Sequence, residues 1–197
     1  MSKRQTPFLA LILFIVSLAS LIVINIPASR IIYKLQVKET QSITYNLEIQ
    51  IPERIWLGES ERVSLFLSED NLLNTTEPEK ILRNLEVDFI LTGAEINPPG
   101  ILVTPIIPGK SINHNWMITP DLTPTSRGSI WVYLQLNPLA LKDNFQRKLI
   151  YTKDIQIEVF KIFGMSKSVF QWILSSIVLI NFLLLCRSLK IKRIAGF

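Results

Sequence analysis

The sequence predicts a mainly β protein, in which an antiparallel β-sandwich is inserted between two transmembrane α-helices. Two uncharged apolar runs predict the helices, one from Phe8 to Ile26 and one from Val169 to Cys186. Each has about 18–19 residues, and at ~1.5 Å per residue a helix of that length crosses a hydrocarbon core of ~30 Å. Between the runs, apolar and polar residues alternate, as is typical of half-buried strands.

These runs divide the 197 residues into five segments. We expect a short basic cytoplasmic tail at 1–7, a first transmembrane helix at 8–27, an extracytoplasmic β-sandwich domain at 28–167, a second transmembrane helix at 168–186 and a basic cytoplasmic tail at 187–197. The central segment has roughly 140 residues, which suits one domain with its own core.

The net charge of +5 resides in the two tails. They hold six of the 21 Lys and Arg residues and none of the 16 Asp and Glu residues, so the segment between them is nearly neutral. Cytoplasmic ends of membrane helices are enriched in Lys and Arg. We therefore expect an integral membrane protein with both termini in the cytoplasm and a periplasmic or extracellular central domain. Because that domain has no concentrated basic field, nucleic acid is excluded as a partner.

A cleaved signal peptide is the competing interpretation of the first run. Lys3 and Arg4 precede the run, and Ser17-Leu18-Ala19 has the small-x-small form of a cleavage site. The apolar residues continue through 21–24, however, beyond the ~7–15 residues of a typical signal h-region. We therefore favour an uncleaved anchor, for which the lipid bilayer is a permanent partner.

The alternation between the runs predicts seven or eight short strands. They lie near residues 33–37, 43–51, 63–67, 85–91, 101–103, 112–118, 130–136 and 155–159. Turn clusters rich in Pro and Gly separate several of them, including 97–100, 108–109 and 119–128. The spacing indicates an antiparallel sandwich, since no strand–helix rhythm points to a parallel sheet.

One short helix is expected between two of these strands. Thr76-Glu77-Pro78-Glu79 fits a capping box with Pro early in the first turn, ahead of Lys80-Ile81-Leu82-Arg83. The overlapping Asn74-Thr75-Thr76 matches the N-glycosylation acceptor pattern, which matters only in a secretory-pathway host.

Two segments resemble immunoglobulin-like and fibronectin-type sandwich domains. One is Pro52 through Val63, with its proline, Gly-Glu turn and strand. The other is Trp116-x-Ile118-x-Pro120, followed by Gly128 and the alternating 130–134. The resemblance is at the level of the fold and covers roughly residues 43–160. It implies that Trp116, on a central strand, packs across the core.

Residues that catalysis needs are scarce. His114 is the single histidine, and alternation places it beside Trp116, so we expect a structural role rather than membership of a hydrolytic triad. Cys186 is the single cysteine, and it is either an apolar helix residue or a palmitoylation site. One Cys and one His cannot form a zinc site. A calcium site near Glu69-Asp70-Asn71 is the alternative to a solvated turn. We predict a protein that is not an enzyme and has no cofactor.

Small and amide residues in the two spans are candidate interhelical contacts, because close helix approach in membranes depends on them. They are Ser17, Ser20, Asn25, Gln171, Ser175 and Ser176. In antiparallel helices Asn25 and Gln171 lie at similar depth, where they either bond each other or meet lipid headgroups. Candidate contacts with a partner protein are Ile106, Ile107, Pro120 and Asn181. The apolar loop tip at 106–107 either contacts that partner or packs on the core.

These observations lead to two functional hypotheses. The first is a non-enzymatic, membrane-anchored accessory or assembly subunit whose outward sandwich binds partner proteins of a membrane complex. The alternative is a membrane-anchored sensor or receptor with ligand-binding sandwich loops. For that alternative Trp56 and Trp131 are candidates for stacking on sugar, although packing within the domain is the expected use of each.

Overall fold

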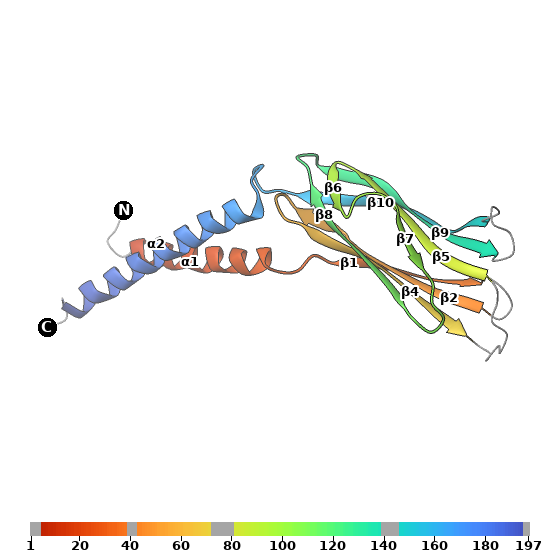
Figure 1. Cartoon of the computed structure of the whole chain (residues 1–197). Helices are drawn as coiled ribbons and strands as arrows, with labels where there is room; N and C mark the ends of the chain where they lie inside the picture. Colours follow the sequence, from red (N-terminus) through yellow and green to blue (C-terminus); the bar gives the residue numbers. More distant parts are fainter. Residues whose placement is uncertain (1–4, 39–42, 72–80, 139–145, 195–197) are drawn as a thin grey trace. The chain divides into compact units, whose positions relative to one another are not determined.

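The computed structural model describes residues 5–38, 43–71, 81–138 and 146–194. The chain forms two compact units (Figure 1). One unit joins Met1–Pro27 with Lys161–Phe197 and contains the two helices. The other, Ala28–Phe160, contains all of the named strands. The chain is therefore mainly β, as predicted.

The helical unit contains α1 (Gln5–Ile24) and α2 (Lys167–Ile194). By length and composition, Lys167–Arg187 is the one stretch among the described residues that could cross a membrane. The apolar stretch described in α1 is Leu11–Ile24, which is shorter than a single span requires. One candidate span is therefore established, and the second crossing stays a prediction.

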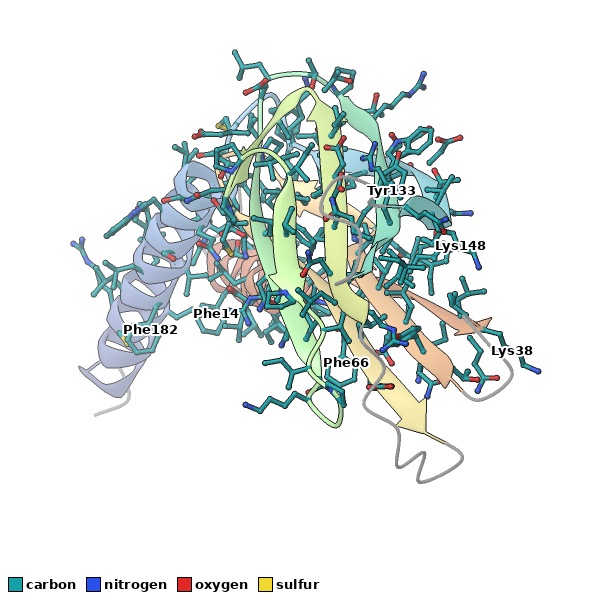
Figure 2. All side chains as sticks on the ribbon, turned by 45° about the vertical axis from the view of Figure 1, so that its right-hand side comes forward. Phe14, Lys38, Phe66, Tyr133, Lys148 and Phe182 are labelled. Atoms are coloured by element: carbon teal, nitrogen blue, oxygen red, sulfur yellow. The ribbon has the colours of Figure 1, made fainter. Side chains whose placement is uncertain are left out.

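The two helices pack through one stripe of residues on each. The less exposed residues recur every three or four positions, as in an antiparallel coiled coil. They are Phe14, Ser17, Leu21 and Ile24 on α1, and Gln171, Leu174, Val178, Asn181 and Leu185 on α2. At one end the rings of Phe14 and Phe182 lie 6.3 Å apart between centroids (Figure 2).

The β unit contains two five-stranded sheets. The first sheet has the order β1 (Arg30–Lys38), β2 (Ile43–Pro52), β4 (Glu61–Asn71), β8 (Ile112–Pro120) and β6 (Ala94–Asn97). The second has the order β3 (Arg54–Trp56), β10 (Gln146–Phe160), β9 (Thr125–Pro138), β5 (Ile81–Thr92) and β7 (Leu102–Pro105). Neighbouring strands pair antiparallel except β3 and β10, which are parallel. The expectation of purely antiparallel pairing is therefore wrong at that edge.

The short helix expected around 76–83 is also wrong in the part that the structure describes. Ile81, Leu82 and Arg83 belong to β5 and pair with β9. Pairing across the sheet outweighs the local helix signal there. The capping sequence 76–79 and the glycosylation acceptor at 74–76 lie outside the described residues.

The two sheets share one hydrophobic core, built from the alternating apolar residues of both. Trp116 of β8 is 0% exposed and meets Phe89 of β5 edge-on, with 5.5 Å between ring centroids. Trp116 therefore packs across the core from one sheet to the other. Truncating a buried aromatic of this kind to alanine costs about 3–5 kcal/mol.

At two residues the chain passes between the sheets. The N–H of Glu53 donates to the Ser29 carbonyl (3.0 Å), while its own carbonyl accepts from the Glu158 N–H (3.2 Å), so β2 leads directly into β3 of the other sheet. Gly93 connects β5 to β6 with φ +79°, a conformation that favours glycine. The Gly93 carbonyl accepts a hydrogen bond from the Ser126 hydroxyl (2.8 Å). The short strands that follow these two residues, β3 after Glu53 and β6 after Gly93, were not predicted from the apolar alternation.

Candidate functional site

The predicted interhelical residues fall into two groups. Asn25 and Gln171 come together, because the Gln171 Nε2 donates to the Asn25 Oδ1 at 3.0 Å. Ser17, 6% exposed, lies in the stripe between the helices. The hydroxyls of Ser20 and Ser176 instead donate to carbonyls of their own helices, at Val16 and Trp172 respectively, and Ser175 is exposed.

Three of the four predicted partner contacts are not free surface residues. Asn181 is 7% exposed and lies in the stripe that faces α1, since it follows Leu174 by two helical turns. Its Nδ2 donates to the carbonyl four residues earlier. Pro120 is buried and pairs with β6, and Ile106 packs against the core. Only Ile107, 47% exposed, presents an apolar surface to a partner.

His114, weighed above as a catalytic residue, and Trp56, weighed as a sugar-stacking residue, both pack within the domain. His114 is half-buried on the core side of β8 beside Trp116, and burial lowers its pKa. The Trp56 ring meets Phe160 edge-on at 4.5 Å between centroids. In the part of the chain that the structure describes, no three His, Cys, Asp or Glu side chains converge as a metal ion requires.

The outer face of the second sheet carries an ordered set of side chains that we call the Arg–Tyr–Trp stack (Arg147, Tyr133 and Trp131). Figure 2 labels its middle member, Tyr133. The guanidinium carbon of Arg147 lies 3.6 Å from the centroid of the Tyr133 ring. The Trp131 ring is nearly parallel to Tyr133, at 6.5 Å and 10°. Trp131 also donates from Nε1 to the Ser129 hydroxyl (2.7 Å), which fixes its orientation.

A buried carboxylate anchors this stack to the sheet. Glu86 of β5 lies on the outer face, directly opposite Tyr133, yet is only 5% exposed. One of its oxygens accepts from Arg147 Nη2 in a salt bridge, and the other accepts from Gln135 Nε2. Both oxygens are thus satisfied, as a buried charge requires. Arg147 remains 41% exposed, so the ion pair joins a buried partner to an accessible one.

Apolar and acidic side chains surround the stack. Ile90 and Val103 are each 53% exposed and Leu149 is 43% exposed, although large apolar residues usually face a core. Asp88 of β5 lies directly opposite Trp131. On the other side of Trp131, β10 places Thr152 opposite it and Asp154 two residues further on, opposite Ser129. Within the described residues neither carboxylate has an ion-pair partner. The face therefore combines rigid aromatic groups and apolar surface with two unpaired carboxylates, next to which an exposed arginine, Arg127, lies one row beyond Ser129.

The open edge of β10 is less suited to binding a further strand than this face is to binding a partner. Among the described residues, 146–157 of β10 pairs with β9 alone. Lys153 on that edge points to the core side, in register with fully buried Ile130, and its ammonium lies 5.0 Å from the Tyr33 ring centroid. Burial, and then the neighbouring Tyr33, raises the pKa of Tyr151. An inward-pointing lysine opposes the docking of a further strand, because pairing would bury its charge.

Sequence reasoning singled out Trp131 but missed the other members of this site. Alternation assigns Glu86 and Tyr133 to a solvent-facing side, and nothing local marks Arg147, which lies 61 residues beyond Glu86. No protein-family model matches this chain, and no curated protein matches it.

Proposed function

We propose that this protein is a non-enzymatic, membrane-anchored accessory or assembly subunit whose β domain binds a partner protein through the outer face of the second sheet. The Arg–Tyr–Trp stack on buried Glu86 carries the proposal. The residues that contribute most to binding energy at protein interfaces are often Trp, Tyr and Arg. Here their side chains are already held in place, so little rotamer entropy is lost on binding.

The charge of the face specifies the partner's chemistry. Asp88 and Asp154 flank Trp131 without cationic partners in the described structure. A lysine or arginine on the partner would meet these carboxylates and the face of the indole, while its neighbouring apolar residues would cover Ile90 and Leu149. The expected partner surface is therefore a basic residue set among apolar ones.

A two-pass membrane anchor completes this proposal. The apolar composition of α2 and the basic tails support a protein with both termini in the cytoplasm and an outward β domain. The strand order, with β3 parallel to β10 at one edge, supports an immunoglobulin-like or fibronectin-type sandwich. Protease treatment of intact cells tests the topology: digestion of the tails, with the middle domain protected, would reverse the orientation.

Site-specific photo-crosslinking tests the binding face. A photoreactive residue is placed at Ile90, beside the stack, or at Ile32, which is similarly exposed on the outer face of the first sheet (53% and 50%). We expect crosslinks to one partner from position 90 and none from position 32. Trp131→Ala and Asp88→Lys should each abolish the crosslink without changing the melting temperature. Equal crosslinking at both positions, or crosslinks that survive both substitutions, would rule out this face.

A further inference from the structure

The outer face of the first sheet carries a second surface of different chemistry. The outward side chains of β4 are, in order, Arg62, Ser64, Phe66 and Ser68. Because serine is small, the face is hollowed on both sides of the phenylalanine. One hollow of about 340 Å³ includes Ser64, and another of about 360 Å³ includes Ser68. Phe66, 40% exposed, forms the ridge between them (Figure 2).

Hydrogen-bonding side chains from four strands surround the first hollow, and Arg30 is the contribution of β1. In register, Ser64 lies between Gln50 of β2 and Asn115 of β8. Arg62 and Asn113 complete the rim. In the described parts of the chain, the side chains of Arg62, Asn113 and Asn115 make no hydrogen bond or ion pair, so their side-chain donors and acceptors are available to a ligand.

A single carboxylate lines both hollows, and its charge is compensated. Glu48 lies 3.3 Å from the Lys34 ammonium and accepts a hydrogen bond from Gln50 at 2.9 Å. The Gln50 amide, and then Lys34, lower the pKa of Glu48, so it stays an ionised acceptor. Three cations line the two hollows, but Lys34 pairs with Glu48 and Arg30 pairs with Glu61 at 3.7 Å. Among the described residues this leaves Arg62 as the unpaired cation of the hollows, which is not the cluster of cations that binds phosphate chains. Phe66 is the exposed apolar side chain between the hollows. The other large exposed apolar side chains on this face, among the described residues, are Ile32 and Met117, and polar side chains of β2, β4 and β8 separate both from Phe66, so they form no continuous apolar core for a protein interface.

We propose that this surface binds a neutral carbohydrate chain, whose rings occupy the hollows and pack against Phe66. A sugar hydroxyl both donates and accepts, which matches a rim of amide, guanidinium and carboxylate groups. The C–H face of a sugar ring is apolar enough to contact a phenyl ring. Successive outward positions of a strand are ~7 Å apart, so the hollows line up along β4 as an extended ligand requires. A carbohydrate site here would favour the alternative function, a membrane-anchored sensor or receptor. Its ligand would then bind on a sheet face and not at the loops of the sandwich.

This proposal does not rest on the protein-binding function, and its test separates the two. The full chain is purified in a detergent without a sugar headgroup and titrated calorimetrically with neutral hexasaccharides: cellohexaose, maltohexaose, xylohexaose and chitohexaose. We expect one of them to bind. Phe66→Ala should weaken that binding on the order of tenfold, the loss of about one good contact. Ser64→Leu, which fills the hollow and leaves Phe66 in place, should abolish it.

Trp131→Ala is the matched control, because it removes an exposed aromatic from the other sheet. It should leave sugar affinity unchanged while it abolishes the partner crosslink, and Phe66→Ala should do the reverse. Melting temperatures within a few degrees of the parent protein show that each variant is folded. The proposal is overturned if none of the four hexasaccharides binds at millimolar concentration, or if binding survives Ser64→Leu in the folded protein.

Discussion

The salt bridge beneath the Arg–Tyr–Trp stack yields the sharpest quantitative prediction. Its partners differ in exposure, since the Glu86 side chain is 6% exposed and the Arg147 side chain is 41% exposed. Exposed ion pairs contribute about 0–1 kcal/mol, whereas removing one partner of a buried pair costs about 3–5 kcal/mol. Arg147→Met leaves a buried, uncompensated carboxylate and also removes the contact with Tyr133. We expect it to destabilise the protein by about 2–3 kcal/mol.

The converse substitution should cost much less. Glu86→Gln removes the buried charge, and the remaining Arg147 can be hydrated because it is partly exposed. We expect a loss of about 0–1 kcal/mol. In the double variant the second substitution should rescue the first, so that Glu86→Gln/Arg147→Met is more stable than Arg147→Met alone. Arg147→Met should cost more than Glu86→Gln because Glu86 is buried and Arg147 is partly exposed.

Thermal unfolding of the full chain in detergent, followed by tryptophan fluorescence, measures these effects. For a domain of this size 1 kcal/mol corresponds to about 3–5 °C, so Arg147→Met should lower the melting temperature by roughly 10 °C. The reasoning is refuted if Arg147→Met behaves as an ordinary surface substitution, or if the double variant is no more stable than it.

Three further predictions concern the fold. A Cβ at Gly128 would lie 1.9 Å from the Ile90 carbonyl oxygen, so Gly128→Ala should force β5 and β9 apart and cost about 3 kcal/mol or more in thermal unfolding. Gly100→Ala, where a Cβ meets nothing within 4 Å, should cost only the ~1–2 kcal/mol of its positive φ, and similar losses would contradict the argument. Burial lowers the pKa of His114, so below about pH 6.5 the unfolded chain binds a proton that the folded protein does not. The melting temperature should therefore fall as the pH drops from 7 to 5, and His114→Gln should reduce that slope; an unchanged slope would count against the assignment. Gln171→Leu removes the hydrogen bond to Asn25, the residue after α1, and should weaken helix packing by about 0.6–2 kcal/mol. The loss should be seen as faster hydrogen exchange at the start of α2, and unaltered exchange would show that the bond contributes nothing.

The two proposed surfaces assign two different roles to one domain, partner binding to the second sheet and carbohydrate binding to the first. They lie on the outer faces of different sheets, and their side chains differ in kind: aromatic, apolar and acidic on the second sheet, amide and hydroxyl on the first. A variant at Trp131 and a variant at Phe66 should thus have independent effects. If each abolished both activities, the cause would be loss of the domain's fold rather than of a binding face.

Much of the secondary structure was predictable because it depends on local pattern. A period of two marks a strand that is buried on one face, and most of the expected runs, such as 43–51 and 112–118, lie inside observed strands. An uncharged run of helix length indicates a membrane anchor in the same way. Local pattern failed where pairing partners decide the outcome. Residues 81–83 are strand, and Ile101, just before β7, and Val103, on β7, are exposed although they look like a core pair.

The sequence by itself determined that this chain has apolar helices, basic tails and a neutral, strand-rich domain, because composition and periodicity are written along the chain. Only the tertiary structure decided which side chains share a face. Register places Glu86 opposite Tyr133, and a side chain 61 residues further on covers its carboxylate. In the same way Ser64 becomes the floor of a hollow through its neighbours on β2 and β8. Such sites depend on long-range pairing, which no local pattern encodes.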